Sequence, residues 1–334
     1  MARFIRRCSP DVILLMYVGW IYDHHPMITF APTVSRFFCR RARFITQFEN
    51  SLGAKLAPGR SRTIWRAIRC IVGRENVDTG FGTLLRDSTR VIFLSERHLE
   101  DLESVFANTR AKSVVIPAPP TMYITPEDNG LSRIRGRAKI NASGDDVVVI
   151  CFGYIYRSKG LDTLIRAFHR LNSKLNVKLL IVGGSLDPDY VNRLFELSKD
   201  LGLAEKIIWT GHCPEEDASV YMRAADICVL PFNFGVRLNN SSLAVACAHG
   251  LPIITTYRDT LEPPFLHEQN VYLCKPRDPG LLRSAIEDVV TRSDLRARLR
   301  SGSLKLAQEW FSWEKTIERT VATFNRASVA ESTK

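Results

Sequence analysis

Six short apolar segments, each followed by a loop and a helical pattern, constrain the fold more than any other feature of the sequence. They lie at residues 147–152, 178–184, 207–210, 227–231, 253–256 and 271–274. After the first of them, Leu161, Leu164, Ile165 and Phe168 recur at the spacing of a helix that buries one face. Strands that alternate with helices in this way predict an α/β fold with a parallel sheet.

A second, shorter alternation precedes this one. Strands are predicted at residues 11–17, 44–48, 90–95 and 113–117, and helices at 27–43, 64–72, 81–87 and 97–106. Residues 121–146 are polar and lack a clear period, which is typical of an interdomain linker. Because 334 residues are many for one core, we predict two doubly wound, Rossmann-like domains, over residues 1–143 and 144–334.

One junction between a strand and a helix, at residues 231–252, has the chemistry of a phosphate site. Its loop contains Gly235 and a cluster of Asn and Ser, and a helix is predicted from Leu243 to His249. Ligands of parallel sheets bind outside the carboxyl ends of strands, and the free N–H groups of a helix start favour phosphate. Arg237, with a fixed fork of donors, lies just before that start. These residues alone fit an ordinary strand–loop–helix unit with a surface arginine equally well.

The positive charge is concentrated in the first part of the chain. The net charge is +11, and residues 1–145 hold 22 Lys and Arg against 13 Asp and Glu. This excess predicts an anionic partner, such as an anionic membrane surface, a phosphorylated substrate or nucleic acid. Scattered solvated arginines are the ordinary alternative. Nucleic acid is the least favoured partner, because no nucleic-acid recognition motif is present.

The sequence lacks the marks of a membrane-spanning or secreted protein. No apolar run approaches the roughly 20 residues that cross a bilayer, and the N-terminus lacks the pattern of a signal peptide. The eight cysteines are widely spaced without a CxxC pair, which indicates buried thiols rather than disulfides or a zinc site. We therefore expect a cytoplasmic protein without a metal or other cofactor.

Several motifs of the second half occur in the order and spacing of one large enzyme family. They are Phe-Gly-Tyr-Ile-Tyr-Arg-Ser-Lys-Gly-Leu-Asp-Thr-Leu-Ile at 152–165, Leu-Ile-Val-Gly-Gly at 180–184, Ile-Trp-Thr-Gly at 208–211, Tyr-Met-Arg-Ala-Ala-Asp-Ile-Cys-Val-Leu-Pro at 221–231, Ala-His-Gly-Leu-Pro-Ile-Ile at 248–254 and Phe-Ser-Trp-Glu at 311–314. Over residues 147–325 the chain resembles the retaining glycosyltransferases of the GT-B fold, of family 4 or group 1 type.

The resemblance implies a ligand for the C-terminal domain and a reaction for the chain. In such enzymes the C-terminal domain binds a nucleotide sugar, and the sugar is transferred with retention to a glycan or lipid-linked acceptor, as in polysaccharide or cell-envelope glycan synthesis. Relatives often use lipid-linked acceptors, which implies a peripheral location at the inner face of a membrane.

The resemblance also assigns donor-site residues. Lys159 matches the family's phosphate-binding lysine, and Arg157 is the substitute for an arginine that the family often has where this chain has Tyr154. The full set of donor-binding candidates is Gly153, Arg157, Lys159, Gly211, Arg237, Asn240, Ser241 and Ser242. Lys159 and Arg237 are the catalytic candidates, because prepositioned donors would stabilise the departing diphosphate.

The chain departs from the family at two glutamates that usually contact the donor. The aligned residues are Arg237 and Val245, and neither side chain accepts a hydrogen bond. A sub-branch with Gly-Val-x-x-Arg-Arg-Ser-Ser-Leu before the Ala-rich helix is more similar here. The loss of both glutamates therefore leaves the donor's identity open.

The first half resembles the family more faintly. Phe48 stands where relatives often have a histidine, while Glu49 and Glu96 match glutamates on the acceptor side. The usual first strands and Gly-rich loop have no counterpart before Asp11, so the first domain is expected to be incomplete. These departures support an alternative function, a truncated or degenerate transferase that only binds a nucleotide or a partner.

Overall fold

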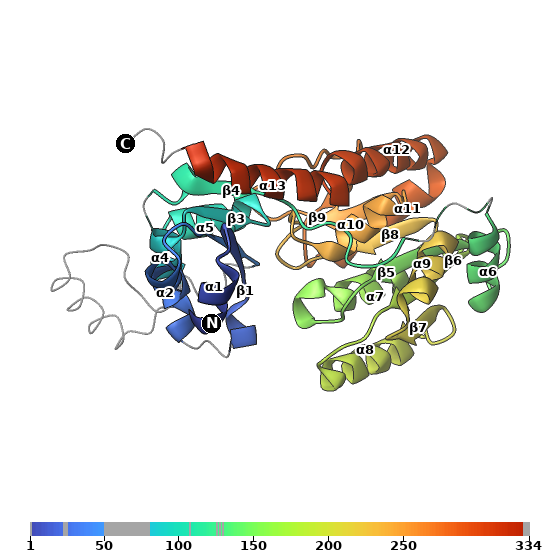
Figure 1. The fold of residues 1–334 in the computed structure, drawn as a ribbon. Coiled ribbons are helices and arrows are strands. Elements are labelled where there is room, and N and C mark those ends of the chain that lie inside the picture. The colour runs from blue at the N-terminus through green and yellow to red at the C-terminus, as the bar shows by residue number, and fades with distance from the viewer. Residues whose placement is uncertain are drawn as a thin grey trace. The chain divides into compact units, whose positions relative to one another are not determined.

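The computed structural model of the chain describes residues 2–22, 26–49, 81–106, 108–124, 126, 128 and 130–329. The helix expected at residues 64–72 lies outside this part of the chain. The fold consists of two compact units, Met1–Pro117 with Thr316–Lys334, and Ala118–Lys315 (Figure 1). The chain therefore leaves the first unit once and returns to it with its C-terminal segment.

The first unit is built on a four-stranded sheet in the order β1-β2-β3-β4, in which all strands are parallel. Its strands are β1 Val12–Tyr17, β2 Arg43–Phe48, β3 Arg90–Phe93 and β4 Ser113–Val115. Its helical elements are α1 Ala2–Cys8, η1 Gly19–Tyr22, η2 Pro26–Phe30, α2 Ala31–Phe38, α4 Phe81–Asp87, α5 Glu96–Glu103, η3 Arg110–Lys112 and most of α13 Trp313–Val329.

Opposite faces of this sheet bury different side chains. On one face the ring of Phe48 stacks on Phe93 and meets Tyr17 edge-on, with centroids 5.5 and 5.6 Å apart. On the other face, Phe324 of α13 packs against the cluster that contains Ile45 and Ile92. Successive residues of a strand point to opposite faces, which is why one strand serves both clusters. The predicted C-terminal domain, residues 144–334, thus differs from the structure at its end, because α13 completes the core of the first unit.

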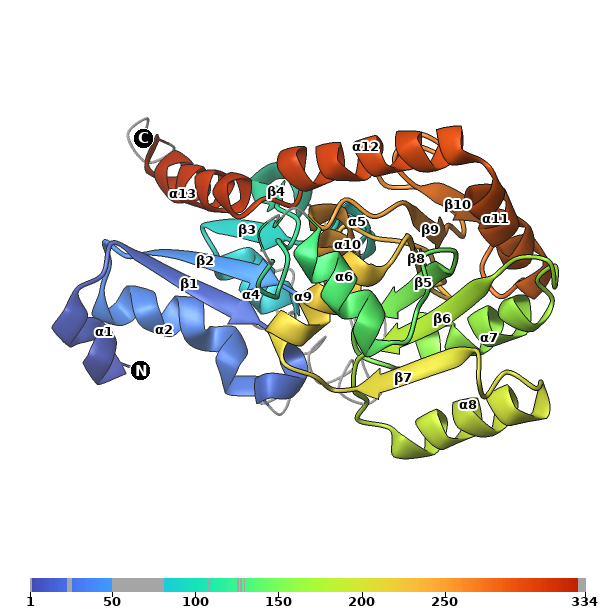
Figure 2. The same cartoon turned by 90° about the vertical axis from the view of Figure 1, so that its right-hand side faces the viewer.

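The second unit is built on a six-stranded parallel sheet in the order β10-β9-β8-β5-β6-β7 (Figure 2). Its strands are β5 Val147–Phe152, β6 Val177–Val182, β7 Ile207–Gly211, β8 Ile227–Leu230, β9 Ile253–Thr256 and β10 Tyr272–Cys274. Its helical elements are α6 Leu131–Lys139, η4 Arg157–Lys159, α7 Leu161–His169, α8 Pro188–Asp200, α9 Glu215–Ala224, α10 Ser241–Ala248, α11 Pro279–Thr291 and α12 Ser293–Glu309.

The strand order of this sheet determines where a ligand can bind. From β5 the chain runs outward through β6 to β7, and then returns to the other side of β5 with β8. The point where the order reverses, between β5 and β8, is the usual crevice for ligands in open α/β sheets. β5 and β8 are buried, as expected for parallel strands with both faces covered.

The predicted fold class is confirmed. The protein is α/β with two parallel sheets of four and six strands, and each strand predicted from the sequence is present with ends that differ by a few residues. None of the helices in the described residues is long and apolar enough to cross a membrane.

The segment predicted to be a linker, residues 121–146, contains the helix α6 and belongs to the second unit. A Cβ atom on Gly136 of α6 would lie 2.5 Å from the carbonyl oxygen of Val220 in α9, so the two helices touch through their backbones. The compact second unit therefore begins at Ala118 rather than at residue 144.

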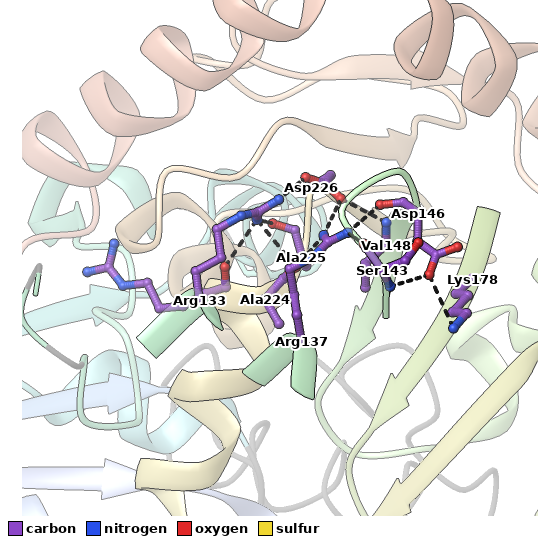
Figure 3. A network of polar contacts seen from close by, with 10 residues as sticks. Arg133, Arg137, Ser143, Asp146, Val148, Lys178, Ala224, Ala225 and Asp226 are labelled. Carbon is purple, nitrogen blue, oxygen red and sulfur yellow. Dashed lines mark hydrogen bonds and ion pairs between the residues drawn. The ribbon is translucent and has the colours of Figure 1, made fainter. Parts of the chain in front are cut away.

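An ion-pair network anchors α6 to the second sheet (Figure 3). The carboxylate of Asp226, directly before β8, accepts hydrogen bonds from Arg133 Nη2 at 2.6 Å and Arg137 Nη1 at 3.3 Å. It also accepts the backbone N–H of Val148 at 2.8 Å. Arg137 is buried and donates further to the carbonyl oxygen of Asp146 at 2.7 Å. Without Asp226, a buried guanidinium would lose its counter-charge.

We expect Asp226→Ala to lower the free energy of unfolding of the second unit by about 3 kcal/mol, because it leaves Arg137 buried and unpaired. Asp217→Ala is the matched control, since Asp217 pairs with Lys139 of the same helix at the surface and should contribute much less. Urea unfolding followed by circular dichroism measures both. Equal losses for the two variants would show that the network does not anchor α6.

Candidate functional site

A cavity of about 470 Å³ opens at the carboxyl ends of the strands of the second unit. Its walls come from the ends of β5 and β6, from residues 212–218 after β7, from the start of α10 and from residues 121–122. The residues that line it are Thr121, Met122, Phe152, Gly153, Tyr154, Tyr156, Lys159, Val182, Gly183, Gly184, His212, Cys213, Glu215, Ala218, Asn239, Asn240, Ser241 and Ser242.

Lys159 is the charged centre of this cavity. The side chain is only 2% exposed, and its Nζ donates to the carbonyl oxygen of Phe152 at 2.6 Å. Nζ also lies 5.7 Å from the centroid of the Tyr156 ring. Burial lowers the pKa of Lys159, and within the described residues no carboxylate pairs with it. A buried ammonium with one carbonyl partner is incompletely compensated, so the site favours an anion in the cavity.

Gly160 makes the burial of Lys159 possible. It follows η4 with φ +81°, a left-handed conformation that favours glycine. A Cβ atom there would lie 2.1 Å from the carbonyl oxygen of Pro231, which follows β8. The turn is thus pressed against the neighbouring strand end, and the lysine before it points inward.

Gly153 brings the β5 loop and the α10 start together. Its φ is +102°, and a Cβ atom would lie 2.9 Å from Lys159 Nζ and 3.3 Å from Ser242 Cβ. A side chain here would therefore displace the ammonium or the helix start. The sequence-predicted residues Gly153, Lys159 and Ser242 meet at one point of the cavity.

The start of α10 presents unpaired donors at the same point. Neither the Ser241 nor the Ser242 backbone N–H has a hydrogen-bond partner in the part of the chain that the structure describes. The Asn240 side chain is turned back to accept the backbone N–H of Arg237 at 2.6 Å, and so does not cap the helix. Free N–H groups with the positive end of the helix dipole suit a phosphate oxygen.

Three predicted donor residues lie outside the lining. Arg157, 62% exposed, pairs with Asp187 at 2.8 Å and lies over the Tyr190 ring, two residues from the buried Lys159. Arg237 is half-buried in the loop before α10, and Gly211 ends β7 with open space around it. None of the three is among the residues of the cavity wall.

The two predicted acceptor-side glutamates share one edge of the first sheet. Glu49 directly follows β2 and Glu96 begins α5 after β3, whose strand ends Phe48 and Phe93 are in register. Burial raises the pKa of Glu49, while Gln47 Nε2 donates to its Oε1 at 2.6 Å. Glu96 pairs with Arg110 at 2.5 Å.

Sequence reasoning did not single out several residues of the wall. Desolvation raises the pKa of Tyr156 to about 12, so its hydroxyl stays protonated even at alkaline pH. Glu215 Oε2 accepts the backbone N–H of Tyr123 at 2.9 Å and so holds residues 121–123 beside the cavity. His212 and Gly184 follow strand ends, which is the signal that would have found them.

A match to a family model shows the family of the chain. The model of the glycosyl transferases group 1 matches residues 132–305, more than half of the chain. The chain belongs to the group 1 glycosyl transferases. All the residues that line the cavity, apart from those at 121–122, fall within the matched range.

Curated relatives of this group 1 glycosyl transferase are distant. An uncharacterized glycosyltransferase of Methanocaldococcus jannaschii is 24% identical over 267 residues, which are 74% of this chain and 66% of that protein. The GDP-mannose-dependent alpha-(1-6)-phosphatidylinositol monomannoside mannosyltransferase of Mycolicibacterium smegmatis is 29% identical over 174 residues. These residues are 50% of this chain and 44% of that protein. The chain thus spans less than two thirds of the length of these relatives.

Solved structures establish the fold. The Anabaena protein HepE in complex with UDP matches with a TM-score of 0.75 at 17% identity, covering 97% of this chain and 80% of that one. The fold of this group 1 glycosyl transferase is therefore GT-B, as the sequence predicts.

We expect Gly153→Ala to destabilise the second unit by about 1–3 kcal/mol, because it combines an unfavourable φ with a collision at Lys159 Nζ. Gly211→Ala is the control, since Gly211 also has a positive φ, +65°, but nothing lies within 4 Å of its would-be Cβ. Gly211→Ala should destabilise the second unit less. Thermal unfolding of both variants measures the difference, and a greater loss for Gly211→Ala would contradict the close approach at Gly153.

Proposed function

We propose that this chain transfers a sugar, with retention, from a nucleoside diphosphate sugar to a glycan or lipid-linked acceptor. The observation that carries the proposal is the buried ammonium of Lys159, which lines the cavity with one carbonyl partner. A donor diphosphate would supply the missing negative charge. The family membership supports a glycosyltransferase, and the names of two similar proteins point to nucleotide donors: one is GDP-mannose-dependent and the other was solved with UDP.

The proposed chemistry depends on stabilising the leaving diphosphate. As the glycosyl bond breaks, charge grows on the diphosphate oxygen, and donors that are already in place stabilise it without reorganisation. Lys159 supplies a charge, and the Ser241 and Ser242 amides supply two N–H groups at a helix start. We assign Arg237 a weaker role from the loop before α10, because it is outside the cavity wall.

On the acceptor side, we assign Glu49 and Glu96 to hydrogen bonds with hydroxyl groups of the acceptor. Both follow strand ends of the first sheet, where ligands of parallel sheets bind. Glu49 is the stronger candidate, because Glu96 is already paired with Arg110.

We expect Lys159→Met to weaken binding of UDP, GDP or ADP by about 10- to 100-fold, the loss for one charged hydrogen bond. Methionine keeps most of the side-chain volume, so the loss reports the charge. Arg237→Ala should weaken binding less. Lys199→Met, at an exposed lysine of α8, is the control and should bind as the parent does. Calorimetric titration measures all four proteins.

Equal binding by the parent and Lys159→Met would contradict the assignment. Release of nucleoside diphosphate from a donor panel, with a membrane extract as acceptor, then separates the enzyme from the alternative function. A parent that binds the nucleotide and releases none from any donor would be a non-catalytic binding protein.

We further propose that the first unit binds anionic membranes peripherally. α1 packs against α2, and their surfaces expose Phe4, Phe37 and Phe38, with Phe37 83% exposed. The same two helices and the turn after α2 carry exposed arginines, namely Arg3, Arg6, Arg7, Arg36, Arg40 and Arg41. Apolar side chains beside basic ones are the composition of surfaces that insert into the interface of anionic bilayers. A lipid-linked acceptor would lie in such a membrane.

We expect the parent to cosediment with anionic vesicles, less at high salt, and poorly with neutral vesicles. Arg41→Glu should weaken this binding, because each basic residue near an anionic surface contributes about 1 kcal/mol. Arg135→Glu, at an exposed arginine of the second unit, is the charge-matched control. Equal binding to both kinds of vesicle would remove the electrostatic explanation.

A further inference from the structure

A second cavity, of about 390 Å³, lies at the amino ends of the strands of the six-stranded sheet. Asp226 and Pro252, which line it, directly precede β8 and β9. Phe152 and Val182, which line the cavity around Lys159 (the proposed donor cavity), end β5 and β6. Because all six strands are parallel, the two cavities are separate sites, one at the carboxyl ends of the strands and one at their amino ends.

Arginine dominates the wall of this second cavity. Arg133 comes from α6, Arg223 from the last turn of α9, and Arg296 and Arg300 from α12. Asp226 is the one carboxylate among the described residues that line it. The four arginines against one aspartate leave an excess of three positive charges.

The aspartate is already committed to structural contacts. As Figure 3 shows, its two carboxylate oxygens accept from Arg133 and Arg137. Arg137 is a further positive charge that is not part of the wall. Asp226 therefore balances the pair that anchors α6. Arg223 interacts electrostatically with the carboxylate of Asp128, which is outside the wall. The excess positive charge thus comes mainly from Arg296 and Arg300 of α12.

His249 adds no charge that would change this balance. Its Nδ1 lies 2.8 Å from the carbonyl oxygen of Val245, and its Nε2 lies 2.8 Å from Ser219 Oγ. Burial lowers its pKa to about 4, so the ring is neutral at physiological pH. The partners are consistent with a donating Nδ1 and an accepting Nε2.

Arg296 and Arg300 lie one turn apart on α12, so their positive charges repel each other. Arg296 Nη1 donates to the carbonyl oxygen of Val289 at 2.9 Å, which is a neutral partner. The Arg300 guanidinium is exposed and has no hydrogen bond or ion pair with any described residue. Like charges at positions i and i+4 of a helix lower its stability. An anion between these side chains would remove that repulsion.

We propose that this cavity binds a small phosphate-class anion with at least two negative charges, such as pyrophosphate or a phosphate monoester. Guanidinium groups match phosphate oxygens through paired N–H donors, which fits arginine rather than lysine in the wall. The volume is at the lower end of the range of small-molecule sites. Ser293, the first residue of α12, also lines the cavity and adds the positive end of a helix dipole.

The test is a calorimetric titration of the full chain with inorganic pyrophosphate at low ionic strength. Pyrophosphate would also enter the proposed donor cavity, so Lys159→Met, which weakens binding there about 10- to 100-fold, is the background in which the second site is measured. In that background we expect Arg300→Ala to weaken binding about tenfold, the loss of one charged hydrogen bond, and Arg300→Glu to abolish it. Arg135→Ala, at an exposed arginine of α6 outside the cavity, should leave binding unchanged.

Absence of pyrophosphate binding in the Lys159→Met background would overturn the proposal. So would binding by Arg300→Ala and Arg300→Glu that is as tight as that of the Lys159→Met background. Vesicles containing phosphatidic acid identify the source of the phosphate. If Arg300→Ala weakens binding of pyrophosphate alone, the ligand is a soluble phosphate; if it weakens both, a lipid headgroup is also accepted. Neither result depends on donor binding at Lys159.

Discussion

All six strands of the second sheet run in one direction, and this constraint decides where the unit can bind ligands. Parallel pairing gathers the loops that follow strands at one edge and the loops that precede them at the other. The loops after β5, β6 and β7 therefore share the cavity that Lys159 lines with the start of α10, although residues from 121 to 242 contribute to its wall. The separation in sequence is large because each parallel neighbour requires a crossover helix.

A buried positive charge lies at each end of the strands of this sheet, and the two charges are compensated differently. At the carboxyl edge, Lys159 is buried without a carboxylate among the described residues, so the protein alone does not satisfy it. At the amino edge, Arg137 is buried with Asp226 and is satisfied within the fold. The first arrangement leaves a buried charge uncompensated within the described residues, while the second fixes a helix. α10 connects the two edges, since Ser242 lines one cavity and His249, directly after the helix, lines the other.

Apolar periodicity predicted the strands and most helices, and it failed where polar groups make the contact. In α6 the apolar residues Leu131 and Ile134 are exposed, while Arg137 and Gly136 are buried, so a search for an apolar face misses the helix. The site shows the same limit. Arg157 and Lys159 are both basic residues of one short turn, yet one is exposed and the other is fully buried. Both residues precede the left-handed turn at Gly160, and the family motif, rather than the local pattern, identified the lysine.

The return of the chain to the first unit affects the order in which the protein can fold. Residues from Thr316 onward belong to that unit, and Phe324 contributes to its core beside Ile45 and Ile92. A ribosome releases residues 118–315 before this segment, so the second unit can fold while the first still lacks one wall. Until synthesis reaches α13, the cluster of Ile45 and Ile92 lacks its contact with Phe324. The first unit can therefore be completed only after the second unit has been synthesised.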